Sequence, residues 1–231
     1  MASDSLETLR DGFAKARQDY KENWKLLDDV LYGLCRKHPY HQEQAEIRAK
    51  VNIIGRTYSS GIERMIKSDK TPGSSMEQLT NCFIENGSQI DSWIAQLSGI
   101  QEPLTDRGVR EVLAVHGQLL RLLAKITKNE RRDQPLARHL QPRSFVSKYL
   151  HFHNAIVPIY DSVASAEIRK VTRKVVGWKA VRNVEFKMAV PVDSDYKDYV
   201  EQFLALYVRM RDAGLKVTVR SLDFYLMWLG S

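Results

Sequence analysis

The residues best suited to chemistry lie in one segment, residues 143–175, which reads RSFVSKYLHFHNAIVPIYDSVASAEIRKVTRKV. Asp161 is the one carboxylate between Arg143 and Glu167. It follows the apolar residues 156–160 and precedes a run with helical spacing. An aspartate at such a position commonly caps a helix, and its charge can also stabilise a cationic transition state or orient a water molecule. The residues alone leave both roles open.

Positive charge is concentrated around this segment. The chain has a formal net charge of +7, yet residues 121–182 hold 14 basic and four acidic residues, so the remainder is slightly acidic. Such a basic block is typical of proteins that bind a polyanion, and we expect nucleic acid as the partner. The candidates for contacts with DNA phosphates are Arg138, Arg143, Arg169, Lys170, Arg173 and Lys174. The last four form a basic ridge, because residues four apart share a helix face.

Composition sets the class of protein. The 231 residues are 43% hydrophobic and 27% charged, which is typical of a globular protein and excludes a disordered chain, a collagen-like fibre and a coiled-coil rod. No apolar run is long enough to span a bilayer, and no apolar signal segment follows Met1, so we expect a cytoplasmic protein that does not enter membranes. Neither a phosphate-binding loop nor a metal-ligand cluster is recognisable, so we expect no cofactor and no metal.

Apolar residues recur with helical spacing along most of the chain, which predicts an all-α, multi-helix globular fold. We expect helices over residues 5–37, 42–68, 76–86, 88–98, 105–128, 143–153, 161–176, 195–213 and 220–229. Residues 183–192 alternate only partly, so they predict a short strand or an extended loop. We expect a single compact domain over 1–231, or two helical lobes, 1–120 and 121–231, with a cleft between them, and a monomeric protein.

Three short motifs in the second half of the chain have counterparts in a known family. They are SFVSK at 144–148, VPIYDS at 157–162 and SLDFYLMWLG at 221–230. Together they resemble the helix-hairpin-helix DNA glycosylase superfamily, and within it the archaeal 8-oxoguanine DNA glycosylases, over about residues 120–230. The glycine-rich hairpin of the wider superfamily is missing, and HLQPR at 139–143 stands in its place.

The resemblance implies an enzyme that flips a modified or damaged base out of double-stranded DNA and excises it. Asp161 matches the catalytic aspartate of the family, whereas Gln141 or Pro142 falls where bifunctional members carry a nucleophilic lysine. The resemblance therefore implies a monofunctional glycosylase, in which Asp161 faces the cationic sugar and water is the nucleophile. In the alternative, Lys148 is the amine that forms a Schiff base. DNA repair and defence against modified foreign DNA are both compatible with this activity.

A base-flipping enzyme needs a pocket whose side chains stack on the base and bond to its edge. The candidates for such a pocket are Tyr149, His151, His153, Tyr160, Arg56 and Tyr58. Packing in the core is the alternative role for these side chains. Arg56 and Tyr58 are included because Gly55 and Gly61 weaken the helix around them, which indicates either close helix contact or an exposed backbone.

Two other functions remain open at this stage. In a helical DNA-binding protein without catalysis, the same basic block would hold DNA and Asp161 would only cap its helix. Residues Arg36 to His41 also match the Arg-x4-His signature of HEPN-type ribonucleases. Pro39 falls inside that match and is expected to break the helix on which the arginine and histidine would have to lie.

Overall fold

A computed structural model describes residues 2–58, 61–66, 73–127, 141–177, 188 and 190–231. The described residues form eleven helices and no sheet, which confirms the prediction of an all-α fold. One isolated antiparallel bridge joins Ile66 to Thr127. The expected strand at 183–192 lies largely outside the described residues.

The helix bounds agree closely with the predicted ranges over much of the chain. The helices of the first half are α1 (Ala2–Asn23), α2 (Lys25–Lys37), α3 (Gln44–Thr57), α4 (Ile62–Met65), α5 (Ser74–Glu85) and α6 (Gly87–Leu97). The remaining helices are α7 (Asp106–Ala124), α8 (Arg143–His153), α9 (Ser162–Val175), α11 (Ser194–Asp212) and α12 (Val219–Leu229). Gly214 ends α11 as predicted, since it has a φ of 80° and its N–H bonds the carbonyl of Arg211 at 2.8 Å.

Two predicted helices are interrupted. The expected helix at 5–37 breaks at Trp24, so that α1 packs against α12 and α9 while α2 packs against α8 and α3. The expected helix at 42–68 ends at Thr57, and Gly61, with a φ of 68°, precedes the short α4. Gly55 stays helical and allows close packing, because a Cβ built there would lie 3.2 Å from Met76 Cε and 3.3 Å from Ile62 Cγ2.

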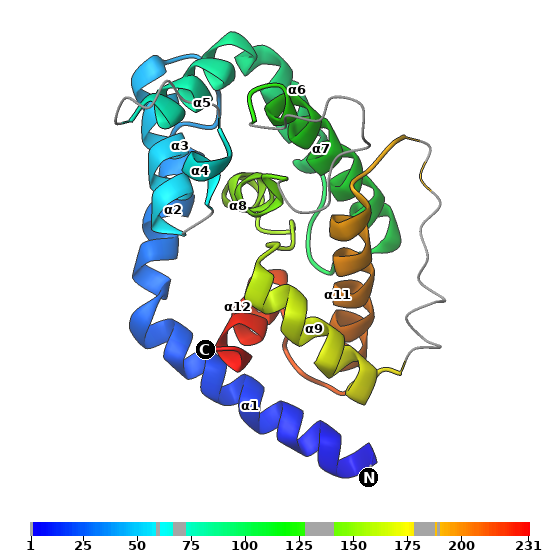
Figure 1. Cartoon of the computed structure of the whole chain (residues 1–231). Coiled ribbons are helices and arrows are strands. Elements are labelled where there is room, and N and C mark those ends of the chain that lie inside the picture. Colours follow the sequence, from blue (N-terminus) through cyan, green and yellow to red (C-terminus); the bar gives the residue numbers. More distant parts are fainter. Residues whose placement is uncertain (1, 59–60, 67–72, 128–140, 178–187, 189) are drawn as a thin grey trace.

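Helix α8 lies at the centre of the molecule, with α2 and α3 on one side and α7 on the other (Figure 1). Phe145, Val146, Tyr149, Leu150 and Phe152 of this helix are each exposed by 1% or less. These apolar residues form one face of α8, and the opposite face carries Ser147, Lys148 and His151, which are also buried and therefore need polar partners.

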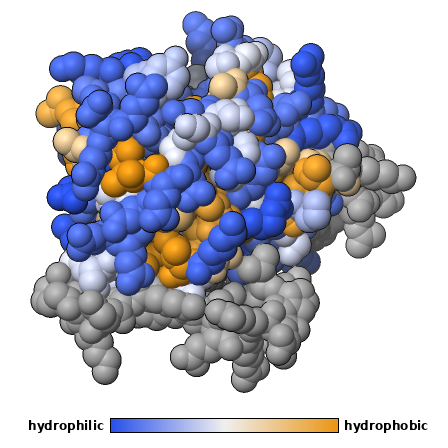
Figure 2. Space-filling view, turned by 90° about the horizontal axis from the view of Figure 1, so that it is seen from above, coloured by the Kyte–Doolittle hydropathy of each residue, from blue (hydrophilic) through white to orange (hydrophobic). Residues whose placement is uncertain are grey.

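The first and last helices of the chain pack together. α1 contacts α12 and α9, and α9 in turn contacts α11 and α12, so these four helices form one group below α8 in Figure 1. Asp161, the candidate carboxylate, therefore stands where this group meets the central helix. The face shown in Figure 2 is largely hydrophilic with small separate hydrophobic patches. No helix of the described residues combines the length and the apolarity needed to cross a membrane.

Candidate functional site

The apolar segment 156–160, which leads into Asp161, is held by side chains of the neighbouring helices. From α8, the His151 Nδ1–H donates to the carbonyl of Val157 at 2.7 Å. Ser147 Oγ, also on α8, accepts from the N–H of Tyr160 at 2.9 Å. An extended segment inside an all-helical protein has no strand to pair with, so buried side chains must satisfy its backbone groups.

Helices α11 and α12 complete this arrangement. The Tyr196 hydroxyl of α11 donates to the carbonyl of Pro158 at 2.7 Å. Asp223 Oδ1 of α12 accepts from the N–H of Ile159 at 3.1 Å. Asp223 is only 1% exposed, and burial raises the pKa of its carboxyl well above the ordinary value. The residues before Asp161 are thus fixed by three helices, which gives the carboxylate a defined position.

Asp161 has two partners. Its Oδ1 accepts from the N–H of Val163 at 2.9 Å, so it caps α9, which is one of the two roles that the sequence left open. Its Oδ2 accepts from Lys148 Nζ at 3.2 Å. The Asp161 side chain keeps 18% of its surface exposed, while that of Lys148 keeps only 4%. Asp161 therefore caps α9 and also forms an ion pair with a lysine that is more deeply buried than itself.

Lys148 makes a second bond from its ammonium group, to the carbonyl oxygen of Tyr58 at 2.8 Å. Burial lowers the pKa of Lys148, and the neighbouring Asp161 carboxylate opposes that shift. The amine thus stands close to its carboxylate in surroundings that favour the neutral form more than water does.

The hydroxyl of Tyr58 leads from Lys148 into a second buried cluster. It donates to Asp28 of α2, a residue with no exposed surface. Asp28 also accepts from the Tyr20 hydroxyl at 2.8 Å and from Arg220 Nη2 of α12 at 3.1 Å. Burial is the main cause of the raised pKa of Tyr58, and Asp28 adds to it. A chain of contacts therefore runs from Asp161 to Arg220 through the interior.

Asp28 and Arg220 were not among the candidates from the sequence. One signal was present, because Asp28 lies three residues before Leu31 and seven before Cys35 on the buried face of α2. A charge on an apolar face must be paired, and it is a strong indication of a structural or functional contact. The sequence does not indicate the partner, because Arg220 lies 192 positions away.

We expect the Asp28→Asn substitution to lower the free energy of unfolding by about 3–5 kcal/mol, because it leaves the Arg220 guanidinium without its buried counter-charge. Urea denaturation measures the change. The matched control is Asp29→Asn, which removes a neighbouring carboxylate whose pair with Lys25 is 54% exposed on both sides. That control is expected to cost less than about 1 kcal/mol. Equal losses in the two variants would contradict the structural role of Asp28.

Two of the three candidate base-pocket residues of α8 are core residues. Tyr149 and His151 have no exposed surface, because α2, α3 and α7 surround this helix, so neither lines an open pocket. His151 instead holds the carbonyl of Val157, and the Tyr149 hydroxyl donates to His41 Nε2 at 2.6 Å. His153 donates from Nδ1 to the carbonyl of Tyr149 at 2.8 Å. The core-packing alternative holds for Tyr149 and His151, whereas His153 keeps part of its surface exposed.

The other three pocket candidates differ in their surroundings. Tyr160 is partly exposed beside Asp161, and its ring lies 5.4 Å from that of Tyr199. Tyr58 contributes its carbonyl to Lys148. Arg56 is exposed and pairs with Glu63 at 2.5 Å. Tyr160 and Tyr58 therefore belong to the surroundings of the Lys148–Asp161 pair, whereas Arg56 is held in a surface ion pair.

The residues predicted to contact DNA phosphates also differ in their exposure. Four of them lie exposed on α9, the helix that begins directly after Asp161: Arg169, Lys170, Arg173 and Lys174. Arg143 is buried, with Nε at 2.6 Å from Asp193 and Nη2 at 3.0 Å from Asp195, so it serves a structural ion-pair cluster instead of DNA phosphates. Arg138 lies outside the described residues.

Two further sequence candidates are buried. Gln141 is 5% exposed just before α8, and its side-chain amide has no hydrogen-bond partner within the described structure. His41 is 5% exposed, and its Nδ1–H donates to Asp91 Oδ1 at 2.6 Å. Because α2 ends at Lys37, Arg36 and His41 do not share a helix, as a HEPN-type site would require.

No group of three or more His, Cys, Asp or Glu side chains suited to a metal ion occurs in the described part of the chain. Comparison of the chain with protein-family models, with curated proteins and with solved structures finds no match. The arrangement of Lys148, Asp161 and the basic ridge of α9 is therefore the basis on which a function is assigned.

Proposed function

We propose that this protein is a DNA glycosylase whose reaction centre is the Lys148–Asp161 pair. The observation that carries the proposal is the 3.2 Å contact between Lys148 Nζ and the partly exposed Asp161 carboxylate. Its second support is the exposed basic ridge of α9, the helix that Asp161 caps. A carboxylate at the start of a cationic helix is suited to a reaction in which positive charge develops on a DNA sugar.

In the proposed reaction the bond between C1′ and the base nitrogen breaks, and the base leaves with the electron pair. Positive charge then develops on the sugar, and the Asp161 carboxylate stabilises it. A water molecule adds to C1′ and loses a proton, which yields the free base and an abasic site. The fixed segment 156–160 supports this role, because a carboxylate in a defined position needs no reorganisation during the reaction.

A second version of the same function uses Lys148 as the nucleophile. Its neutral amine would attack C1′ as the base leaves, lose a proton and form a Schiff base with the opened sugar. The lowered pKa of the buried Lys148 amine favours this version. The two versions differ in whether enzyme and DNA become covalently joined.

The test uses a panel of duplexes that carry oxidised or bulky modified bases, with abasic sites scored by alkaline cleavage. The proposal predicts base release from at least one duplex. Borohydride reduction separates the two versions, because only a Schiff base is trapped, and trapping should then vanish in the Lys148→Gln variant. Duplex binding without release of any base would instead favour a non-catalytic DNA-binding protein.

The basic ridge allows a separate prediction. We expect the double variant Arg169→Gln/Arg173→Gln to weaken duplex binding and to reduce the salt-dependence slope by about two, because each phosphate contact contributes about one. Fluorescence anisotropy at several salt concentrations measures both quantities. The control is Arg107→Gln/Lys216→Gln, which removes two exposed cations that lie outside α9. An equal loss in the control would indicate that only the total charge matters.

A further inference from the structure

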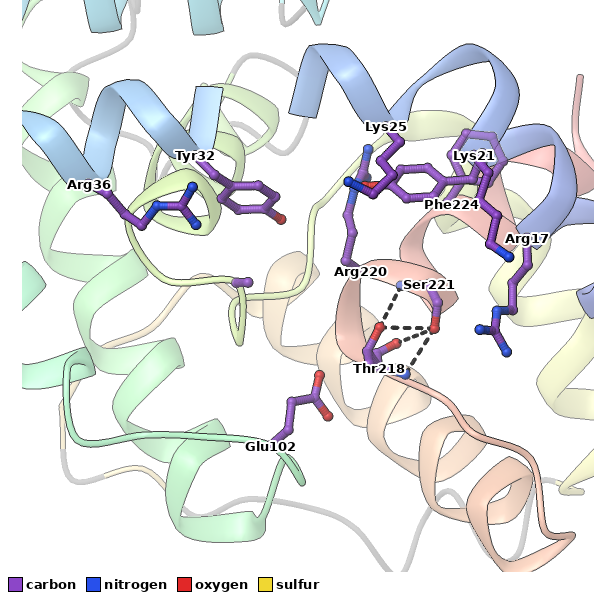
Figure 3. Close-up of a pocket in the computed structure, with 12 residues that line it drawn as sticks. Arg17, Lys21, Lys25, Tyr32, Arg36, Glu102, Thr218, Arg220, Ser221 and Phe224 are labelled. Atoms are coloured by element: carbon purple, nitrogen blue, oxygen red, sulfur yellow. Dashed lines mark hydrogen bonds between the residues drawn. The ribbon is translucent and has the colours of Figure 1, made fainter. Parts of the chain in front are cut away.

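A pocket opens between α1, α2 and the start of α12 (Figure 3). We call it the α1–α12 pocket. Its volume is about 510 Å³, within the range of small-molecule sites. The cations that line it are Arg17, Lys21, Lys25, Arg36 and Arg220, and the aromatic rings are those of Tyr20, Tyr32 and Phe224. Of these cations, Arg36 belongs to the Arg-x4-His match and Arg220 directly precedes the motif at 221–230.

Lys25 and Arg220 of this pocket are paired with Asp29 and Asp28, and within the described residues its other three cations are not paired with a carboxylate. No carboxylate of the described residues forms a salt bridge with Arg17, Lys21 or Arg36. Arg17 and Lys21 stand four residues apart on α1, a spacing at which like charges destabilise a helix. Lys21 and Arg36 stand in the last turns of α1 and α2, where the helix dipole favours a cation. The helix dipole does not account for Arg17 or for the convergence of these three cations on one pocket, whereas an anionic ligand does.

The acidic residues near the pocket are already engaged. Glu102 Oε1 accepts from the N–H of Val219 at 2.6 Å, and its Oε2 accepts from the Tyr207 hydroxyl. Asp28 lies behind Arg220 with no exposed surface. The first amides of α12 are also in use, since the N–H of Ser221 donates to Thr218 Oγ1 at 3.1 Å. Side-chain cations, and not the helix end, thus remain available to a ligand.

The hydroxyls of the two lining tyrosines are already hydrogen-bonded within the protein. The Tyr20 hydroxyl is bonded to Asp28, and the Tyr32 hydroxyl is bonded to His151 Nε2. Phe224 lies 5.2 Å from the Tyr20 ring, measured between ring centroids. The carbon faces of these rings are therefore what the pocket offers beside its cations, a combination suited to an aromatic group that carries phosphate.

We propose that the α1–α12 pocket binds a nucleotide, with its phosphates on the cations and its base against the aromatic rings. The nucleotide is either free or part of a DNA strand, because both present the same phosphate and base. The site is formed by residues other than Lys148, Asp161 and the ridge of α9. The test of this proposal is therefore independent of the test of the glycosylase function.

The experiment is isothermal titration calorimetry of the full chain at physiological salt, with ATP, GTP, dCTP and tripolyphosphate as probes. We expect saturable binding of a nucleoside triphosphate at one site, at least about tenfold tighter than tripolyphosphate. The double variant Arg17→Gln/Arg36→Gln should weaken it by about tenfold or more, because charge-assisted bonds to phosphate are lost. The matched control is Lys15→Gln/Lys37→Gln, which changes exposed cations of the same two helices outside the pocket.

A 5′-phosphorylated single-stranded hexanucleotide distinguishes the two sources. Tighter binding of the oligonucleotide than of any free nucleotide, lost in the same pocket variant, assigns the site to a DNA strand. The proposal is overturned if neither class of probe binds saturably, or if tripolyphosphate binds as tightly as every nucleotide. It is also overturned if the Arg169→Gln/Arg173→Gln variant loses the binding and the pocket variant keeps it.

Discussion

The Asp161→Asn variant is expected to release base at least about 100-fold more slowly than the wild-type protein. Asparagine keeps the shape of the side chain but removes the negative charge that would stabilise the cationic sugar. It also caps a helix as well as aspartate does, so the bond to the N–H of Val163 is expected to persist. The substitution thus separates catalysis from capping, and single-turnover assays on the best duplex of the panel measure the effect.

Two controls accompany this measurement. Asp106→Asn removes a carboxylate from the first turn of α7, and it should leave base release unchanged. The unfolding free energy of the Asp161→Asn variant should be measured too, because Lys148 loses its partner in that variant. If stability is lost, the double variant Lys148→Gln/Asp161→Asn removes the unpaired amine. Base release at the wild-type rate in either folded variant would exclude Asp161 as the catalytic carboxylate.

The protein is expected to unfold in mild acid, between about pH 6 and pH 4. Burial lowers the pKa of His41 to about 4 and those of His116, His151 and His153 to about 3. The same groups titrate near 6.5 in an unfolded chain. The unfolded state therefore binds more protons below pH 6.5, and the free energy of unfolding decreases as the pH is lowered through this range. Four histidines together give a slope of about 5 kcal/mol per pH unit, against a typical total of about 5–15 kcal/mol.

Buried Asp223 acts in the opposite direction, because its raised pKa makes the folded state hold a proton that the unfolded state releases above pH 4. One carboxyl offsets only part of the effect of four histidines. Urea denaturation at pH 7.5, 6.5 and 5.5 measures the slope. His116, whose ring centroid lies 3.7 Å from that of Tyr196, is the site for a control, since His116→Phe should remove about one quarter of the slope. A stability that is unchanged from pH 7.5 to 5.5 would contradict the prediction.

Most helices could be predicted because their signals are local. The apolar spacing of 143–153 and 161–176 and the cap at Asp161 lie within a few residues of the elements they define. The prediction of one continuous helix fails at Trp24, because no local signal there ends a helix. The break allows α1 and α2 to pack against different helices. The interruption at Gly61 has a local cause in its positive φ, yet the sequence also allows a helical glycine, as Gly55 shows.

The candidate site was predicted in part. The sequence indicated Asp161, Lys148 and the ridge of α9, because a lone carboxylate among cations is visible in one segment. It did not separate the buried side chains from the available ones. Tyr149 and Arg143 have the residue types of a DNA-binding site, yet one is enclosed by three helices and the other is paired with Asp193 and Asp195.

The sequence by itself determined an all-helical chain with a basic ridge behind a capping aspartate, since periodicity, caps and charge are properties of neighbouring residues. The tertiary structure alone decided which charges meet. It joins Asp28 to Arg220 across 192 positions, and it places the unpaired cations of α1 and α2 around the start of α12. Such contacts depend on how helices far apart in the chain pack, because the free energy of burying a charge is set by the partner that packing brings to it.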